Sequence, residues 1–394
     1  MQVICIVNNK TILWNQNITS IGDGAFSDCS NLTSIKVSIT DKALFLSNHI
    51  AAQIKKAIGK NVQLIDEEGN EITHFVIPDD VTSIYAGAFS NCRGLTSITM
   101  GRGVTSIGEN AFEGCSNLTD LIISDMAAWC SVSLYYDRSH RFNIESHPLW
   151  NNRTHHIYLD GQEVIDLKIP EGVASIGDYV FYGCQNLKSV SIPKSVTSIG
   201  EEAFHGCFRL ETVNISNLEA WCRISFCSNP LSYAHRLFMN GAEITNLIIP
   251  EDVTNIGSYA FLGCSQITSI TIPGSVTSIG QEAFSGMTAL DHVYCYAKNL
   301  PSTGADVFKD SNTEYVGTLH IPEASLRDYS ITDPWRNFKN IVALTGEELP
   351  VSEIRDDLSS TRQFYTLDGK PAGKGQKGVQ IVWSGGKSKK VLVK

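Results

Sequence analysis

The chain has 394 residues, 42% hydrophobic and 18% charged, so it can bury a continuous core and is not a disordered chain. Its formal net charge of −10 argues against nucleic acid or an anionic membrane as a partner of the main body. No apolar run approaches the ~20 residues that span a bilayer, and the run Val3–Val7 is too short for a signal segment. A leader, with or without a first capping turn, is therefore expected to be missing from this sequence.

A repeated motif organises the chain from near its N-terminus. Counted from the Ile of a Ser-Ile pair, it has Phe at +5, Cys at +8 and Leu at +11 in most copies, and apolar residues at +14 and +16. Seven copies keep the Phe in register, and they begin at Ile21, Ile84, Ile107, Ile176, Ile199, Ile256 and Ile279. The interval between adjacent copies is constant, and a fixed period of this kind is the signature of a solenoid. We expect a mainly β fold of short parallel strands, with L-x-x-I-x-I and V-T-S-I extended and A-F-x-G-C forming the turn between them.

A longer repeat interrupts this rhythm three times. After each interruption the chain returns through the motif G-x-E-[IV]-x-x-[LF]-x-I-P, found at Gly69–Pro78, Gly161–Pro170 and Gly241–Pro250. The larger unit is therefore two short repeats and one long one, and it extends from Ile84 to Ile176 and again, in a shorter form, from Ile176 to Ile256. In the first long repeat, apolar residues at helical spacing predict one short helix near residues 48–58.

The second long repeat carries a ten-residue insertion, residues 135–144, that the third one lacks. A tolerated surface loop is the simpler interpretation, because insertions in solenoids map to loops on one face. The insertion is also rich in the residue types of binding hot spots. The candidate binding residues are Tyr135, Tyr136, Arg138, His140, Arg141 and Phe142. We expect a specific partner to engage this loop first, while the Ser and Thr side chains between the apolar strand positions add a flat hydrogen-bonding face.

The repeat explains most of the eleven cysteines. Six of them occupy position +8, where the last copy has Met287, so the position is an apolar one and the thiols are expected to be buried. Cys130 and Cys222 share a second register, A-W-C. Parallel side-chain directions on stacked strands give poor disulfide geometry, so bridges such as Cys92 to Cys115 are not expected.

The pattern decays after Phe284, and larger aromatic residues follow it. We expect a solenoid over residues 1–345 with a terminal cap over about 290–345, a linker over 346–360 and a small β module over 361–394. The last of these segments is basic, opposite in sign to the body.

The motifs I-G-x-x-A-F-x-G-C and L-x-x-I-x-I-P resemble the BspA-like class of bacterial leucine-rich repeats over roughly residues 17–345. The tail, from Y-T-L-D-G-K to K-K-V-L-V-K, resembles a small C-terminal β module of exported proteins of Bacteroidetes-type bacteria. The resemblance implies a secreted or surface-anchored protein that binds host or neighbouring-cell macromolecules. It supplies no catalytic residues. We expect an extracellular protein or glycan as the ligand, and a monomer.

Four histidines, His140, His147, His155 and His156, lie close together in the sequence. Their spacing fits neither H-E-x-x-H nor a Cys/His finger. His155 aligns with His235 in the third long repeat, which has no such cluster. We therefore expect no metal, no cofactor and no catalytic residue. A binding or adhesion protein is favoured over a passive spacer or envelope component, and both are favoured over an enzyme that uses the His140–His156 region.

Overall fold

The computed structural model describes residues 63–135, 147–149 and 156–344, together with single strands and one helix outside these ranges. The chain divides into two compact units, Met1–Ile341 and Val342–Lys394. The first unit begins with a four-stranded sheet in the order β1-β2-β3-β4 and a short helix, α1. These elements are β1 (Ile6–Val7), β2 (Thr11–Trp14), β3 (Ser34–Val37), β4 (Gln63–Ile65) and α1 (Lys42–Ser47).

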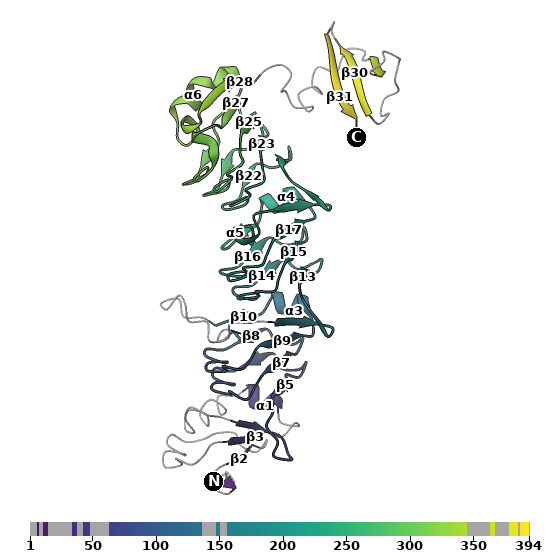
Figure 1. The fold of residues 1–394 in the computed structure, drawn as a ribbon, viewed down its shortest axis with the longest axis vertical. Helices are drawn as coiled ribbons and strands as arrows, with labels where there is room; N and C mark the ends of the chain where they lie inside the picture. Colours follow the sequence, from purple (N-terminus) through teal and green to yellow (C-terminus); the bar gives the residue numbers. More distant parts are fainter. Residues whose placement is uncertain are drawn as a thin grey trace. The chain divides into compact units, whose positions relative to one another are not determined.

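Most of the first unit consists of three blocks, each built on a five-stranded sheet (Figure 1). We call them block 1 (residues 74–163), block 2 (166–243) and block 3 (246–343). In block 1 the strands are β5 (His74–Val76), β7 (Ser97–Met100), β9 (Asp120–Ile123), β11 (His156–Leu159) and β12 (Gln162–Glu163). In block 2 they are β13 (Asp166–Lys168), β15 (Ser189–Ile192), β17 (Thr212–Ile215), β19 (Leu237–Met239) and β20 (Ala242–Glu243). In block 3 they are β21 (Asn246–Ile248), β23 (Ser269–Ile272), β25 (His292–Cys295), β27 (Thr318–Ile321) and β28 (Asn340–Ala343).

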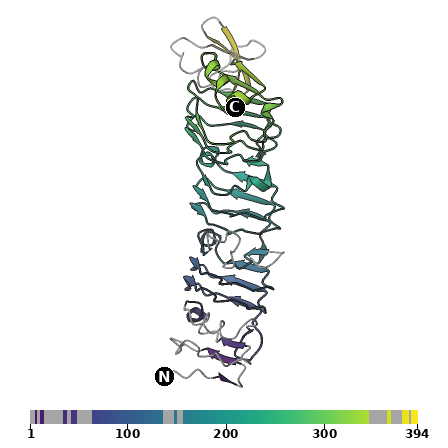
Figure 2. The same cartoon turned by 90° about the vertical axis from the view of Figure 1, so that its left-hand side faces the viewer.

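Neighbouring strands pair in parallel with a fixed register, so equivalent residues form columns along the stack (Figure 2). Val190 of β15, for example, pairs with Val213 of β17. The four-residue strands of the short repeats alternate between half-buried and buried positions, as the period-2 pattern of the sequence predicts. Branched side chains fill the buried positions, where they fit the pleated surface. The prediction of a mainly β solenoid of short parallel strands is confirmed.

A three-stranded sheet of two-residue Ser-Ile-type strands runs along the opposite side of each block. Its strands are β6 (Ser83–Ile84), β8 (Ser106–Ile107) and β10 (Ser133–Leu134) in block 1, β14 (Ser175–Ile176), β16 (Ser198–Ile199) and β18 (Ser225–Phe226) in block 2, and β22 (Asn255–Ile256), β24 (Ser278–Ile279) and β26 (Ser302–Thr303) in block 3. The Ile of each V-T-S-I segment points into the core, since these positions are fully or almost fully buried.

The A-F-x-G-C turns join the two sheets and place one Phe per layer in the core. The rings stack between adjacent layers, with centroids 5.3 Å apart for Phe181 and Phe204 and 5.5 Å apart for Phe284 and Phe308. The glycine of the turn has a positive φ, and a Cβ on Gly206 would lie 3.2 Å from the Cα of the glycine in the layer before it. A stack this tight requires glycine.

The cysteines at position +8 are buried, as predicted, in the described copies Cys92, Cys115, Cys184, Cys207 and Cys264. The thiols of Cys115 and Cys207 donate to the carbonyls of Phe89 and Phe181 in the preceding layer, at 3.0 and 3.2 Å. Cysteine therefore supplies a small apolar group with a donor for a buried carbonyl. All cysteines within the described residues have free thiols, and of these only Cys227 is exposed.

In blocks 1 and 2 the long repeat replaces the Phe turn with a short helix that the sequence analysis did not predict. These helices are α3 (Met126–Cys130) and α4 (Leu218–Cys222), capped by the side chains of Asp125 and Asn217. Five residues cannot display a helical period, and only the capping residue marks the helix in the sequence. The tryptophans of these helices donate their indole N–H to carbonyls of the next block, at 2.9 Å to Val180 and 2.8 Å to Ala260. They thereby connect the blocks where the ladder of turns is interrupted.

Another short helix, α5 (Leu231–Ala234), follows α4 in block 2. It lies between two Phe turns, because Asn229 just before it donates to the Tyr259 carbonyl at 2.7 Å and Tyr233 contacts His205 of the preceding turn at 2.9 Å. In block 1, His147 occupies the position of Asn229 and accepts a hydrogen bond from the Leu149 N–H at 3.1 Å.

The parallel strands of blocks 1 and 2 end in tight hairpins. β11 and β12 are joined by Asp160 and Gly161, both with positive φ, and β19 and β20 by Asn240 and Gly241 in the same conformation. This is the turn that Asp-Gly and Asn-Gly sequences favour. The hairpin strand is antiparallel, so the hydrogen-bonded sheet stops there and a new sheet starts in the next block.

Block 3 ends instead in irregular segments that cover the core. They are η2 (Asn312–Glu314), η3 (Glu323–Ser325), α6 (Leu326–Ile331) and η4 (Trp335–Asn337). Trp335 and Phe338 meet the ring of Phe308 edge-on, with centroids 5.6 and 5.1 Å away, and Tyr329 packs against Trp335. The last Phe of the stack is thus covered by aromatic rings.

The second unit contains an antiparallel sheet of β29 (Gln363–Thr366), β30 (Gly378–Ser384) and β31 (Lys387–Val393). The helix predicted near 48–58 and the linker predicted over 346–360 lie outside the described residues. The proposed domain boundaries remain predictions.

Candidate binding surface

The predicted binding loop is described only at its first residue. Tyr135 is exposed, at 49% of its accessible surface, and its backbone N–H donates to the Ile107 carbonyl at 2.9 Å. Tyr136, Arg138, His140, Arg141 and Phe142 lie outside the described residues. The role of the loop therefore remains a prediction.

The open side of the five-stranded sheets, which we call the sheet face, carries the short polar side chains that the repeat predicts. In the short repeats these include Ser97 with Thr99, Ser189 with Ser191, and Ser269 with Thr271, all half-buried. Several hydroxyls are already used between layers: Ser189 donates to Asp166 at 2.6 Å and Ser269 to Asn246 at 2.9 Å.

The sheet face also carries aromatic and basic side chains that the sequence analysis missed. They occupy the last layers of each block, at the same strand positions as the hydroxyls. We call them cluster 1 (His156, Tyr158), cluster 2 (Arg236, Phe238) and cluster 3 (His292, Tyr294, His320). The register places Tyr158 beside Ile122, Phe238 beside Asn214 and Tyr294 beside Thr271. Each block therefore presents at least one aromatic ring on the sheet face.

A glutamate from the hairpin orients clusters 1 and 2. Glu163 contacts His156 Nδ1 at 2.7 Å and accepts from Asn186 at 2.8 Å. Those hydrogen bonds, that of Asn186 first and that of His156 second, hold the pKa of the Glu163 carboxyl below its usual value. The ring of Tyr158 lies 6.3 Å from that of His156. The repeated spacing of the G-x-E motif thus places a carboxylate against the first residue of the cluster.

In cluster 2 the equivalent glutamate, Glu243, binds an arginine instead of a histidine. Arg236 donates two hydrogen bonds to Glu243, both at 2.8 Å, and its guanidinium lies 5.2 Å from the centroid of Phe238. This bidentate geometry fixes the planar guanidinium beside the ring. The hydrogen bond from Arg236 also lowers the pKa of the Glu243 carboxyl.

Cluster 3 contains two histidines from adjacent strands. His292 Nδ1 and His320 Nε2 are 3.2 Å apart, and the rings of Tyr294 and His320 stack with centroids 4.4 Å apart. The three rings form one continuous aromatic surface, in which His292 and Tyr294 are half-buried and His320 is buried. Such a surface offers ring faces for stacking and ring nitrogens for hydrogen bonds.

The histidines considered as a zinc or catalytic group are in different environments where they are described. His147 is buried, with its ring edge-on to Trp129, whereas His156 belongs to cluster 1. His140 and His155 lie outside the described residues. Within the part of the chain that the structure describes, no three His, Cys, Asp or Glu side chains are grouped as metal ligands would be.

The outward positions of the long-repeat strands were visible in the sequence. The long-repeat segments H-I-Y-L (156–159) and R-L-F-M (236–239) alternate large polar or aromatic residues with apolar ones, and so does H-V-Y-C (292–295) in the short repeat that begins at Ile279. The sequence analysis took the alternation of the short repeats as typical of the whole face, and so missed these clusters.

Comparison with known proteins identifies the fold family. The family model of the BspA type leucine rich repeat region matches residues 5–59, 67–152, 155–233 and 224–328. The family model matches no residue beyond 328, so the resemblance of the tail to a Bacteroidetes-type module stays a prediction.

Solved structures with similarity to the chain include bacterial leucine-rich repeat proteins. One from Bacteroides ovatus is 18% identical over 86% of this chain and 93% of that chain, with a TM-score of 0.40. One from Eubacterium ventriosum is 21% identical over 64% and 67%, with a TM-score of 0.36. A leucine rich cell surface protein of Faecalibacterium prausnitzii is 28% identical over 72% and 78%, with a TM-score of 0.30.

No curated protein matches the chain. Among the helices of the described residues, none has the length and apolar character of a membrane span. The family model covers well over half of the sequence with the repeats that build all three blocks. The chain therefore belongs to the BspA-type leucine-rich repeat family.

Proposed function

We propose that this chain is a non-enzymatic binding or adhesion protein of the cell surface or extracellular space. In this proposal it recognises a glycan or protein chain of a host or neighbouring cell through the sheet face, and loop 135–144 contributes contacts of its own. The observation that carries the proposal is the recurrence of aromatic and basic clusters on one face of a rigid stack. Solenoids use such repeated surface positions for binding.

The chemistry of the clusters supports a binding role. Aromatic and Arg side chains dominate binding hot spots, because they bury large areas with few rotatable bonds. In cluster 1 the His156 side chain is already held by Glu163, and in cluster 2 the Arg236 side chain is already held by Glu243. A side chain fixed before binding loses less conformational entropy when the ligand arrives. A passive spacer has no need of such fixed groups.

The test compares two matched triple variants on glycan and extracellular-matrix protein arrays. One replaces the rings, by Tyr158→Ala, Phe238→Ala and Tyr294→Ala. The control replaces hydroxyls at equivalent positions in the same three blocks, by Thr99→Ala, Ser191→Ala and Thr271→Ala. We expect the ring variant to bind the array ligand at least about tenfold more weakly, since hot-spot rings contribute about 2 kcal/mol or more. The control should stay within about threefold.

Two results would count against the proposal. If the protein binds nothing on either array, the result favours a passive spacer or envelope component over a binding protein. If both variants bind a ligand as well as the parent chain, the sheet face is not the binding surface. Circular dichroism of both variants checks that the fold is kept.

A further inference from the structure

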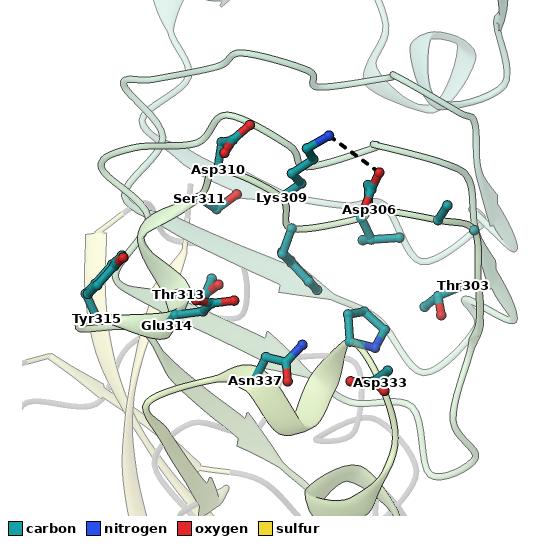
Figure 3. Close-up of a pocket in the computed structure, with 15 residues that line it drawn as sticks. Thr303, Asp306, Lys309, Asp310, Ser311, Thr313, Glu314, Tyr315, Asp333 and Asn337 are labelled. Carbon is teal, nitrogen blue, oxygen red and sulfur yellow. Dashed lines mark ion pairs between the residues drawn. The ribbon is translucent and has the colours of Figure 1, made fainter.

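A cavity of about 550 Å³ lies in block 3, away from the sheet face. It is bounded on one side by the last Phe turn, residues 303–311, and on the other by η2 and the segment Asp333–Asn337 (Figure 3). Its volume is within the range of ligand sites in proteins. Nothing in the proposed sheet-face function uses this cavity.

The turn that forms one wall is the last member of a hydrogen-bonded ladder. In block 3, three alternate backbone N–H groups of each Phe turn donate to three carbonyls of the next turn. Those of Tyr259, Phe261 and Gly263 donate to Gln281, Ala283 and Ser285, at 2.8, 2.9 and 2.8 Å. Those of Glu282, Phe284 and Gly286 donate in turn to Ala305, Val307 and Lys309, at 3.0, 3.0 and 2.8 Å.

The last Phe turn, residues 303–311, is followed by no further turn that could accept hydrogen bonds from its backbone N–H groups. The equivalent groups are the N–H groups of Asp306, Phe308 and Asp310, and within the described residues none of them has a hydrogen-bond acceptor. All three residues line the cavity. Phe308 is buried, whereas Asp306 and Asp310 are exposed, so water can pair with the two outer donors until the carbonyls of a ligand replace it. The cavity therefore presents three aligned donors that the carbonyl oxygens of a ligand would satisfy.

The end of block 2 shows how the chain covers the same edge when it does so itself. There α5 lies over the equivalent turn of residues 202–206, and the backbone of Gly206 hydrogen-bonds the side chain of Tyr233, while the N–H groups of Glu202 and Phe204 have no acceptor among the described residues. In block 3 the aromatic cap covers the Phe308 ring but leaves space over the backbone of the turn.

The charge of the cavity lining indicates which kind of ligand would bind there. Its lining contains the carboxylates of Asp306, Asp310, Glu314 and Asp333 against one ammonium, that of Lys309. Lys309 pairs with Asp306 at 3.7 Å, as the dashed line in Figure 3 shows. Asp310 and Glu314 have no ion-pair partner among the described residues. A phosphate or an acidic peptide would be repelled, whereas a basic side chain would be attracted.

We propose that this cavity binds an extended peptide segment that carries Lys or Arg. Three alternate carbonyls of the peptide accept from Asp306, Phe308 and Asp310, and its basic side chains lie against Asp310 and Glu314. The peptide thus adds a layer to the ladder, as a peptide strand is added to an open sheet edge. Trp335 and Phe338 already fill the inner position over Phe308, so the peptide residue there has a small side chain.

The probe is the peptide acetyl-Ala-Lys-Ala-Lys-Ala-amide, titrated into the full chain and followed by ¹H–¹⁵N chemical shifts and calorimetry. Acetyl-Ala-Glu-Ala-Glu-Ala-amide is the matched control peptide. We expect the lysine peptide to bind, and to shift the amide signals of Asp306, Phe308 and Asp310 most. The glutamate peptide should not bind.

A pair of variants separates the cavity from general attraction to an acidic protein. Asp310→Asn with Glu314→Gln removes two charges at the cavity, and should weaken binding about fivefold or more, the effect of two partly screened ion pairs. Glu171→Gln with Asp252→Asn removes two exposed charges elsewhere and should leave the affinity unchanged.

Three outcomes would overturn the proposal. They are no binding of the lysine peptide at millimolar concentration, equal loss in both double variants, or amide shifts that spread over the surface without favouring residues 306–310. None of these outcomes bears on the sheet face, because the ring variant described above leaves the cavity intact.

Discussion

The contact between blocks 2 and 3 permits a quantitative test of how the stack is held together. Trp221, exposed by only 1%, donates its indole N–H to the Ala260 carbonyl at 2.8 Å. Trp221→Phe removes this hydrogen bond, a net loss of about 1 kcal/mol, and some buried ring atoms, a loss of about 1–2 kcal/mol more. We therefore expect the variant to be destabilised by about 2–3 kcal/mol.

The Ala260 carbonyl has a second donor, Asn229 Nδ2, at 3.2 Å. Asn229→Ala alone also removes the bonds of this side chain to the Tyr259 carbonyl and from the Leu231 N–H. Each single variant leaves one donor at the carbonyl, whereas the double variant leaves none. Because a buried acceptor without a partner costs more than a lost bond, we expect the double variant to be less stable than the sum predicts by about 1 kcal/mol.

The assay is urea unfolding followed by circular dichroism, with hydrogen exchange of the segment 255–263 as a local measurement. The control pair is Trp129→Phe with Asn229→Ala, which lie in different blocks and share no carbonyl. That pair should be additive within about 0.5 kcal/mol. Additivity of Trp221→Phe and Asn229→Ala as well, or a loss below about 0.5 kcal/mol for Trp221→Phe, would refute the reasoning.

Three further predictions concern thiols, pH and the inserted loop. Burial raises the pKa of the Cys222 thiol to about 12 and shields the other core thiols, so brief alkylation of the native chain should modify Cys227 first among the described cysteines; rapid native labelling of Cys207, read by mass spectrometry, would contradict this. Because its folded pKa is lowered, the Glu243 carboxylate stabilises the fold above its unfolded pKa of about 4.3, and this contribution is lost as pH falls through the lower folded value. Glu243→Gln should therefore cost less than about 1 kcal/mol at pH 7 and nothing near pH 2, and an equal cost at both pH values in urea unfolding would be inconsistent with the ion pair. Deleting residues 135–144 should leave the melting temperature nearly unchanged, since block 2 closes without an insertion, but should weaken binding of any array ligand; undiminished affinity would rule the loop out.

The strands and turns could be predicted from the sequence because seven copies share one pattern of apolar residues. Alternation within L-x-x-I-x-I and the fixed place of Phe determine which side chains are buried, and Phe181, Phe204 and Phe284 lie where the pattern places them. The helices α3 and α4 could not be predicted by period, since each has only five residues. Their signal is the capping Asp125 or Asn217 before M-A-A-W-C or L-E-A-W-C.

The candidate surfaces were less predictable, for different reasons. The clusters follow from strand alternation and required only that the strands of the long repeats and of the last short repeat be analysed with the same period. The cavity in block 3 could not be derived from any pattern, because the cap is not a repeat. Its position depends on how the chain around Trp335 closes over Phe308, which the sequence of the turn alone does not determine.

The way each block ends has a consequence for how proteins of this kind change length. Because a hairpin closes the five-stranded sheets of blocks 1 and 2, no β-ladder would be cut if block 2 were excised between Ile165 and Thr245, two equivalent positions that lie between sheets. Trp129 would then face the Ala260 carbonyl, as Trp221 now does, since Val180 and Ala260 occupy the same place in their turns. Recombination at these positions would remove or add whole blocks with their clusters and preserve every junction. The reach of the molecule and the number of its binding clusters would change together.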